Sequence, residues 1–505
     1  MAKPTLLQDD FSLGMKHDLP REQLPKGSVW ALTDWLVKND APLQRRGAWS
    51  LQNVPSATST TAHYMAGVGF AQFTAGSKVV SFDDAGVLWA ASVTSVSSSS
   101  VGAAFVPAAP PVFYRQKLYV PDVNASAVPK VYDGSTVAAM TASAPSAALG
   151  CVYKDHLVLA RSTANTNRMW FSSGGDPTGW VTSASGQYLD TTYPIQGLGA
   201  LRNMIIVFSE GYTERVRGDI IPGVSGSDFV KEPLFPVGCS DPASICVTDD
   251  YVVFANASGI YLTDGSSIAD LTDQSSNKQY WQELMASYAA AWTIAGAVYN
   301  GQYVFSVMNG ATLITCGVLD IRRRVFTQLS NVKATMMVAT PTGILDAPAA
   351  LFFAVRDSSV STRPVGNATT MWTQAGNSAY RQDYVGTGPA PVVETAYYQG
   401  REGLKRWKNL YVRYLQTDAA TDNPLLRAYF QTDPASTSYS TLNQAYPENT
   451  ATSLVRLPIA AGGNAYGGQR SNGIAFKLVG ESYSGDLRIN SLQAEIEIQE
   501  PSKQS

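Results

Sequence analysis

The sequence predicts a mainly β protein: a β-propeller-like array of short antiparallel blades, with an irregular N-terminal arm before it and a C-terminal β-sandwich after it. Three observations lead to this fold class. The chain of 505 residues is rich in strand-forming side chains, with 25 Tyr and 10 Trp. A short apolar run after a polar turn recurs at nearly regular spacing. Roughly the last 110 residues contain segments with alternating apolar and polar positions.

The N-terminal arm is predicted to comprise residues 1–62. Prolines punctuate it at Pro20, Pro25, Pro42 and Pro55, and a polar tract follows at 56–61. One short helix is expected over 29–32. Because Trp30, Trp35 and Leu36 lack an obvious core of their own, we expect the arm to pack against a neighbouring subunit or platform. On this interpretation, removing the first fifty residues would prevent assembly and still leave a folded monomer.

The propeller-like domain is predicted to comprise residues 63–385, where a weak internal repeat is found. Equivalent positions are Val79, Leu118, Leu157, Ile205, Val252, Tyr303 and Leu351. They lie roughly 39 to 51 residues apart, the spacing of four-stranded blades. We expect these runs to be inner blade strands. Asp83–Gly86 and Asn256–Gly259 resemble hairpin turns that lead to a second arm. One or two large β-sandwiches with accidental spacing remain the alternative.

Helix is scarce, and the best candidate runs from about residue 278 to 291, with Trp281 and Leu284 at helical spacing. We interpret it as a packing insertion between blades. The C-terminal domain, residues 386–505, is predicted to be a separate antiparallel sandwich. Its strongest strand signal is Leu492–Ile498, where apolar and polar residues alternate strictly.

Charged residues make up only 15% of the chain and the net charge is −3. These values argue against a broad basic face that binds nucleic-acid phosphates. Nucleic acid could still pass along a weakly acidic surface without being held. No apolar stretch approaches about 18 residues and the N-terminus has no apolar signal region, so neither a membrane helix nor secretion is expected. The four cysteines, Cys151, Cys239, Cys246 and Cys316, form no CxxC pair and are expected to be isolated thiols. Synthesis in a reducing cytoplasm follows.

Candidate catalytic groups are few. The three histidines, His17, His63 and His156, have no accompanying GxSxG nucleophile motif, and zinc, P-loop and dinucleotide motifs are missing from the sequence. The acidic doublets Asp9-Asp10, Asp83-Asp84 and Asp249-Asp250 are glycosidase candidates by residue type alone, and the last two fit hairpin turns. The segment Gly174–Trp180 is interpreted as a turn cluster. We therefore predict no catalytic residue, no cofactor site and no metal site.

Two dense basic spots occur, Arg45-Arg46 and Arg322–Arg324. The prevailing interpretation is a solvated turn or an intersubunit salt bridge, and a phosphate contact is the alternative.

The order of several short motifs resembles the tail-nozzle and tail-hub proteins of short-tailed bacteriophages. The opening carries Phe11–Met15, Leu24–Ser28 and Leu43–Gly47, which resemble the family's phenylalanine–glycine segment, leucine-proline-x-glycine turn and closing arginine-glycine. In the middle and near the end, Tyr153–Leu159, Met169–Ser173, Gly175–Trp180 and Lys405–Lys408 also resemble that family. The likeness covers most of the chain in organisation.

The resemblance implies a virion structural protein that forms a ring, commonly a hexamer, in the phage tail. Such a ring extends the DNA channel, retains packaged DNA and allows its ejection. Its implied partners are copies of itself, adaptor and portal-side tail proteins, tail fibres and the passing DNA, without sequence-specific binding. Its implied location is the virion tail, assembled in the cytoplasm of the bacterial host. Alternatives are a tail-tip or head-completion protein of a long-tailed phage, a carbohydrate-binding or carbohydrate-degrading tail propeller, and a bacterial surface adhesin.

Overall fold

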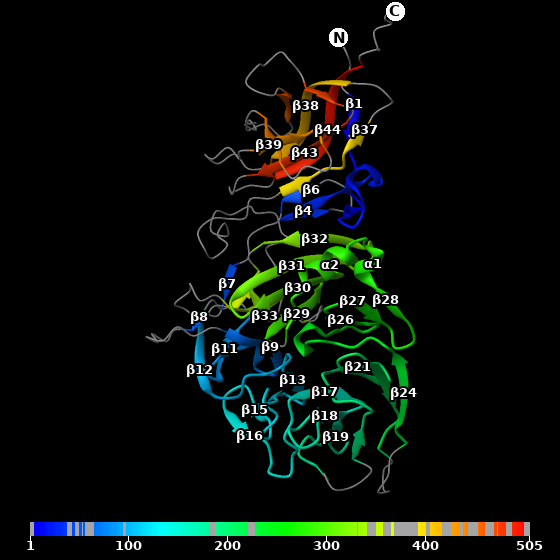
Figure 1. The fold of residues 1–505 in the computed structure, drawn as a ribbon. Helices are drawn as coiled ribbons and strands as arrows, with labels where there is room; N and C mark the ends of the chain where they lie inside the picture. Colours follow the sequence, from blue (N-terminus) through cyan, green and yellow to red (C-terminus); the bar gives the residue numbers. More distant parts are fainter. Residues whose placement is uncertain are drawn as a thin grey trace, which may run out of the picture.

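The structure is a computed structural model that describes residues 5–37, 43–45, 50–52, 54–55, 65–93, 97–180, 187–220, 228–289, 291–330, 332–340, 350–356, 365–367, 392–399, 405–416, 426–433, 438–442, 453–459, 469–471, 473–480 and 487–498. It is mainly β, as predicted. Within these residues, seven four-stranded antiparallel units follow one another around a ring, and a further pair of sheets lies beyond one side of the ring (Figure 1).

The seven units are the blades of a β-propeller. Their first strands are β9 (Met65–Phe73), β13 (Val112–Tyr114), β17 (Leu149–Tyr153), β21 (Gly197–Leu201), β25 (Cys246–Val247), β29 (Trp292–Tyr299) and β33 (Ala334–Ala339). Each first strand contacts the first strand of the next blade, and β33 contacts β9, so the ring is closed. Stacking around a ring buries both faces of each blade, which no blade could achieve alone.

The predicted repeat is confirmed: each of its seven apolar runs forms the second strand of a blade. These strands are β10 (Gly76–Asp83), β14 (Lys117–Val120), β18 (His156–Ala160), β22 (Met204–Phe208), β26 (Val252–Asn256), β30 (Gln302–Asn309) and β34 (Leu351–Val355). The prediction that they are the inner strands is off by one position, because the first strands are the ones that meet around the axis. Burial on both faces explains why the runs are continuously apolar rather than alternating.

The remaining blade strands complete the seven sheets. The third strands are β11 (Val87–Ser92), β15 (Lys130–Tyr132), β19 (Arg168–Phe171), β23 (Thr213–Arg217), β27 (Gly259–Thr263), β31 (Thr312–Asp320) and β35 (Val365–Asn367). The fourth strands are β12 (Ser97–Ala103), β16 (Val137–Ala139), β20 (Tyr188–Asp190), β24 (Val230–Phe235), β28 (Ile268–Asp270) and β32 (Val325–Leu329). In the last blade, the fourth strand is β7 (Ser50–Gln52), which comes from the N-terminal segment.

The N-terminal segment clasps the two ends of the ring. Strand β7 pairs with β35 of the last blade, and β8 (Val54–Pro55) then pairs in parallel with β12 of the first blade. The two pairings lie within six residues of sequence, so one short stretch of backbone connects the outer edges of both blades. Strands β7 and β8 therefore link the last blade to the first at their outer edges, in addition to the contact between β33 and β9 at the axis.

Beyond the propeller, two further sheets combine strands from both ends of the chain. The first contains β38 (Lys405–Gln416), β44 (Leu487–Ile498), β41 (Ser453–Pro458) and β42 (Gln469–Ser471), together with β1 (Thr5–Gln8), β5 (Trp35–Val37) and β6 (Leu43–Arg45). The second contains β36 (Val392–Glu394), β37 (Tyr398–Gln399), β43 (Gly473–Gly480), β39 (Leu426–Gln431) and β40 (Ser440–Thr441), together with β4 (Ala31–Thr33). The predicted self-contained C-terminal sandwich is thus corrected, because N-terminal strands complete both sheets.

Strand β4 joins the second of these sheets to the propeller. It pairs antiparallel with β36 and also meets β32 of the sixth blade in parallel, at Gln328 and Thr33. Two short strands, β2 (Gly14–Met15) and β3 (Ser28–Val29), pair with each other, and β2 also pairs with β32. The sixth blade and the C-terminal sheet are therefore parts of one continuous set of hydrogen-bonded strands.

Two expectations for the arm are wrong. Over 29–32 there is no helix: Val29 ends β3, Trp30 is a bend, and Ala31 and Leu32 begin β4. Trp35 is fully buried and Leu36 is 5% exposed, so they do have a core within their own chain. The physical reason is that these strands are only two or three residues long, too short to show a period in the sequence. The partners of β4 also lie about three hundred residues or more away.

One hydrophobic cluster runs through the junction between propeller and C-terminal sheets. Trp35, Trp281, Phe305, Trp407 and Phe476 all belong to it. Trp281 lies on α2 (Lys278–Leu284), which ends earlier than the predicted helix over 278–291, and a single turn, α1 (Leu271–Gln274), precedes it. Neither of these helices, the ones found in the described ranges, is long and apolar enough to cross a membrane.

Candidate functional site

The acidic doublets flagged in the sequence occupy turns. Asp83 ends β10, and its carboxylate accepts hydrogen bonds from the backbone N–H of Ala85 at 3.0 Å and of Val87 at 2.8 Å. The Trp89 indole also donates to it, at 3.2 Å. Three donors satisfy this buried carboxylate, so Asp83 shapes the β10–β11 hairpin as the turn interpretation predicted.

The other two doublets lie in different parts of the molecule. Asp250 forms an exposed ion pair with Arg202 across two neighbouring blades. Asp10 accepts from the backbone N–H of Ser12 at 2.8 Å, and Asp9 lies 3.6 Å from Lys26. The structure does not bring the doublets together, whereas glycoside hydrolysis requires two carboxyl groups on either side of one bond.

His156 and Asp219 lie close together, but the geometry is not that of a catalytic triad. The His156 ring bonds the Ser172 carbonyl oxygen through Nδ1 at 2.6 Å and the Asp219 carboxylate through Nε2 at 3.1 Å. The Ser172 hydroxyl is engaged elsewhere: it accepts from the Leu157 N–H and donates to the Ser173 carbonyl. The imidazole therefore links the start of β18 to the segments that follow β19 and β23, and within the described residues its two ring nitrogens bond no hydroxyl or thiol that it could activate.

His17 is packed between aromatic rings. Its ring centroid lies 4.4 Å from that of Trp30 and 4.5 Å from that of Tyr280. Burial lowers the pKa of His17, so the neutral imidazole is favoured in this apolar contact. His63 lies outside the described residues.

The basic run at 322–324 lies in the β31–β32 turn, and one of its arginines links this turn to the N-terminal segment. Arg323 bonds Asp320 at 2.9 Å and also donates to the Val37 carbonyl oxygen at 2.9 Å, which ties the β31–β32 turn to β5. Arg324 donates to the Ile321 carbonyl oxygen. Arg46 lies outside the described residues, and of Arg45 only the backbone, in β6, is described. The turn interpretation thus fits Arg323 and Arg324.

All four cysteines are free thiols. Cys239 and Cys316 are fully buried. Burial raises the pKa of Cys151 and of Cys239 to about 12 and that of Cys246 to about 11, which disfavours the thiolate needed for redox or nucleophilic chemistry. Within the residues that the structure describes, no three His, Cys, Asp or Glu side chains gather into a metal site.

The motif residues of the N-terminal segment build the junction. Phe11 is fully buried in the cluster shared by propeller and C-terminal sheets. Gly14 has a φ of +59°, and a Cβ at this position would overlap the Val325 side chain of the sixth blade. A side chain here is therefore excluded twice, by backbone strain and by the close approach of β32.

The Leu24–Ser28 motif forms a turn that closes on itself. The Ser28 N–H and hydroxyl both donate to the Pro25 carbonyl oxygen, at 3.2 and 2.6 Å. Gly27, with a φ of +90°, accepts from the Leu13 N–H at 2.9 Å. The first two of the three family-like motifs of the opening are thus bonded to each other.

A buried polar network holds η1 (Arg21–Gln23) against the second C-terminal sheet. Arg21 donates to Glu394 at 2.7 Å, to Gln431 at 2.5 Å and to the Tyr439 hydroxyl at 2.6 Å. Its guanidinium also lies 3.8 Å from the centroid of the Trp30 ring. Lys477 reaches the other oxygen of Glu394 at 3.0 Å. Sequence reasoning missed this network, since nothing local marks Arg21 as different from other arginines.

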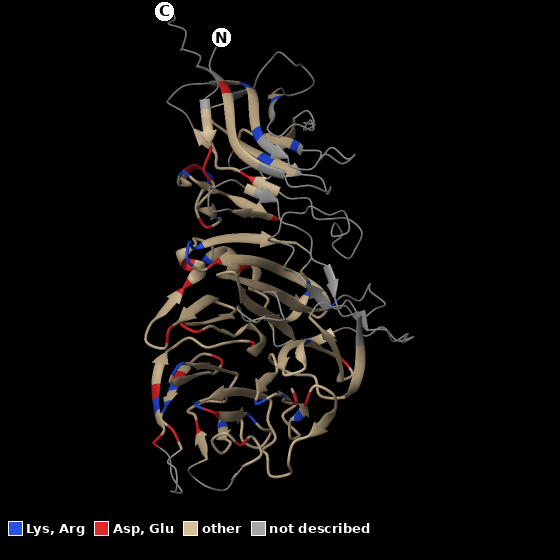
Figure 2. Ribbon diagram, turned by 180° about the vertical axis from the view of Figure 1, so that it is seen from behind, with Lys and Arg blue, Asp and Glu red and all other residues tan. Residues whose placement is uncertain are grey.

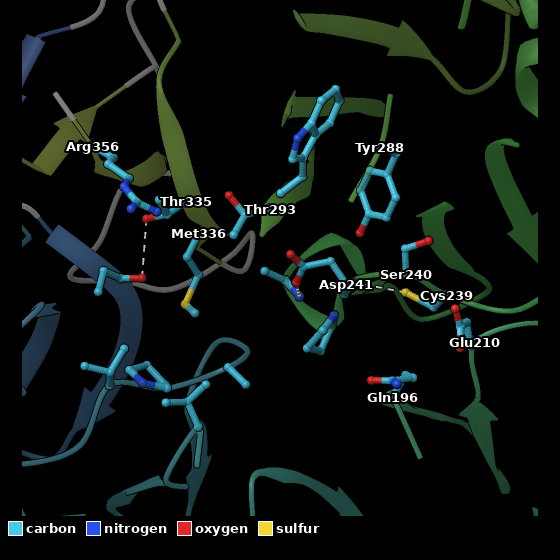
Figure 3. Close-up of a pocket in the computed structure, with 18 of the residues that line it drawn as sticks. Gln196, Glu210, Cys239, Ser240, Asp241, Tyr288, Thr293, Thr335, Met336 and Arg356 are labelled. Atoms are coloured by element: carbon cyan, nitrogen blue, oxygen red, sulfur yellow. Dashed lines mark hydrogen bonds between the residues drawn. The ribbon is translucent and has the colours of Figure 1, made fainter. Parts of the chain in front are cut away.

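A cavity of about 680 Å³ opens at the propeller axis, and side chains from all seven blades line it (Figure 3). Its walls come from loops that enter first strands, such as those of Gln196 and Asp241, and from loops that leave second strands, such as those of Arg161, Glu210 and Arg356. Sequence reasoning missed these residues too, because each of the seven blades supplies only one or a few of them.

Asp241 lines this cavity and connects two of the blades. Its carboxylate accepts from the Ala243 N–H at 2.9 Å, which caps η2 (Pro242–Ser244), and from the Ile294 N–H of β29 at 3.0 Å. Burial raises the pKa of Asp241 to about 6, against the lowering effect of these two bonds and of Arg161. Arg161 itself donates to the Gln196 side-chain oxygen at 3.0 Å.

Comparison with known proteins gives a fold likeness only. No family model and no curated protein sequence matches the chain. Among solved structures, BBS1N in complex with ARL6DN aligns at 12% identity and a TM-score of 0.38, over 64% of this chain and 97% of that one. BamB from Moraxella catarrhalis aligns at 11% identity and a TM-score of 0.32, over 60% and 84%. YCF48 bound to D1 peptide aligns at 7% identity and a TM-score of 0.37, over 65% and 96%. These scores are too low to carry an argument, so the propeller rests on the strand pairing of the chain itself.

Proposed function

We propose that this chain is a non-enzymatic structural protein of a bacteriophage tail, one segment of a ring that extends the DNA channel. The observation that carries the proposal is the place of the family-like motifs. Phe11, Gly14 and the turn at Pro25–Ser28 lie together at the junction of propeller and C-terminal sheets. These motifs of the opening build one architectural joint, which a shared architecture explains best, whereas the motifs at 153–180 lie in the third blade.

The charge pattern supports a wall that DNA passes without being held. Basic and acidic positions are interspersed along the described ribbon rather than gathered into one basic field (Figure 2). Many of the cations are paired, as Arg168 is with Asp190 at 2.6 Å and Arg215 is with Glu232 at 2.5 Å. Each phosphate bound by an unpaired cation would add affinity, and a genome in transit would stall on such a lining.

In this proposal the protein assembles with copies of itself, commonly six in the family it resembles, and contacts adaptor or portal-side proteins and tail fibres. The virion tail is its location, after assembly in the cytoplasm of the host. A carbohydrate-degrading propeller would be favoured by acidic pairs facing one pocket. In the described ranges, the three doublets instead serve separate turns and ion pairs.

Cryo-electron microscopy of the purified protein tests the proposal. Class averages should show closed rings of propeller-bearing subunits around an open axial bore. Solitary monomers at micromolar concentration, together with turnover of a host polysaccharide that a single Asp or Glu substitution abolishes, would contradict it. Rings without an axial bore wide enough for duplex DNA would contradict the conduit and favour a tail-tip role.

A further inference from the structure

The axial cavity has the size and the position of a binding site. At about 680 Å³ it falls within the range of roughly 300–1,000 Å³ that is typical of ligand pockets. It lies where the loops of all seven blades converge, so it is formed only when the ring is closed. Nothing in the proposed tail role requires such a recess.

One wall of the cavity is acidic. Asp241 and Glu210 lie on the same side as Tyr288 and Ser240 (Figure 3). Each Asp241 oxygen accepts one backbone N–H and retains lone pairs for a further donor. Within the described residues, the Glu210 carboxylate has no hydrogen bond or ion pair, and Glu210 is exposed. Burial and the negative charge of Asp241 raise the pKa of the Tyr288 hydroxyl to about 12, as expected where the local potential is negative.

Arg161, a cation that lines the cavity and interacts with Asp241, already has a hydrogen-bond partner. Arg161 donates to Gln196 at 3.0 Å, and its backbone is fixed at a φ of +61° by a bond from its N–H to the Arg168 carbonyl oxygen. Its charge interacts with that of Asp241. Arg356, the other cation, lies across the cavity from Glu210 (Figure 3). An incoming anion would meet the carboxylates near Arg161, whereas an incoming cation finds acceptors with unused lone pairs.

The wall that completes the recess is apolar. Val106, Pro107, Val123 and Met336 contribute to it. Val123 is 37% exposed, one of the few large apolar side chains that the described chain leaves open to solvent. An acidic wall facing an apolar one suits a long side chain with an aliphatic stem and a cationic head. Trp292, by contrast, is 7% exposed and cannot offer the open ring face on which a sugar would stack.

We infer that the axial cavity receives a loop or chain end of a second protein, which inserts an arginine or lysine side chain between the acidic wall of Asp241 and Glu210 and the apolar wall of Val106 and Val123. The stem packs on the apolar wall, and the cationic head donates to the carboxylates. This inference does not depend on the proposed function in a phage tail, because the site would bind any protein partner that carries such a segment.

Matched peptides test the site on the intact chain. The probes are acetyl-Gly-Arg-Gly-amide, its neutral citrulline analogue, acetyl-Gly-Glu-Gly-amide and a neutral disaccharide, each titrated to millimolar concentration and followed by ligand-observed NMR. The arginine peptide should bind, and the citrulline analogue should bind about tenfold more weakly or not at all, because only the charge and its donors differ. Equal binding of the two, preference for the glutamate peptide, preference for the disaccharide, or no binding at all would overturn the proposal.

Variants locate the binding. Glu210→Gln should weaken the arginine peptide about threefold or more, and because Glu210 is exposed and unbonded, this variant should fold normally. Asp241→Asn should weaken binding further, although it also removes an acceptor that joins two blades. Asp250→Asn is the matched control, since Asp250 lies in a β25–β26 loop at the opposite end of the strands. An unchanged affinity in Glu210→Gln, or an equal loss in Asp250→Asn, would place the peptide elsewhere and refute the site.

Discussion

Arg21 and Glu394 form a buried ion pair at 2.7 Å, although 373 positions separate them in the sequence. Arg21 belongs to the N-terminal segment and Glu394 to strand β36, so the pair fixes one end of the chain to the other. Arg21 also bonds Gln431 and Tyr439, and Lys477 supports Glu394 from the far side. The N-terminal segment is thereby an internal part of the fold.

Replacing Arg21 should be costly. Arg21→Ala leaves Glu394 buried with Lys477 as its remaining cation, so we expect a loss of about 3 kcal/mol in the free energy of unfolding, measured by urea denaturation. Arg115→Ala is the control, because Arg115 pairs with Asp155 at 2.6 Å on the surface and should barely change stability. Equal midpoints for the two variants would show that the buried network contributes nothing.

A charge in a second strand should disrupt a blade. Ile206 and Val253 are fully buried in β22 and β26. Ile206→Asp or Val253→Asp should therefore lower the free energy of unfolding by several kcal/mol, since a carboxylate would enter the sheet unpaired. Val230→Asp, on the outer strand β24 at 53% exposure, should change it by less than about 0.5 kcal/mol. A variant of either buried residue that melts like the parent would refute the blade assignment.

Asp241 should make stability fall as the pH rises. Burial raises the pKa of Asp241 to about 6 from its ordinary value of 3.8, so it binds a proton more tightly when folded. Its contribution is therefore fully present below about pH 4 and is lost as the pH rises through about 6. Between about pH 4 and pH 7 the parent should lose about 2 to 3 kcal/mol relative to Asp241→Asn, as measured by denaturation at each pH.

Asp264 provides a control of opposite sign. Bonds from the backbone N–H groups of Ser267 and Ser266 lower the pKa of Asp264 to about 2. Its contribution is present above about pH 4 and is lost as the pH falls through about 2. If Asp264→Asn and Asp241→Asn changed the pH profile in the same direction, the account of both carboxylates would be wrong.

Duplex DNA should bind feebly. We expect dissociation constants on the order of 10⁻⁴ to 10⁻⁶ M at physiological salt, equal for unrelated sequences, as for non-specific contacts. The pI of about 5.7 and the paired arginines motivate this. Fluorescence anisotropy at several salt concentrations checks it. Nanomolar binding, or discrimination between sequences, would contradict a conduit that must release what it passes.

The sequence predicted the second strands of the propeller blades well, but it did not predict the short strands that the N-terminal segment contributes. Runs such as Val252–Phe254 and the turn at Asn256–Gly259 carry strong local signals, because burial on both faces and a tight turn each restrict residue type. Strands β4 and β7 carry none, since each has three residues and pairs across most of the chain. The cavity residues could not be predicted either, because each of the seven blades supplies only one or a few of them and no local pattern connects them.

Truncation of the N-terminal segment tests the central claim most directly, namely that this segment completes the last blade, links it to the first and joins the ring to the C-terminal sheets. A chain that lacks residues 1–55 loses β1 to β8, and with them the fourth strand of the last blade and the link to β32. We predict that it loses its cooperative thermal transition and is digested rapidly by protease, whereas removal of residues 1–4 alone has no effect. A truncated chain that remains a folded monomer, with the melting temperature of the full-length protein, would contradict the account.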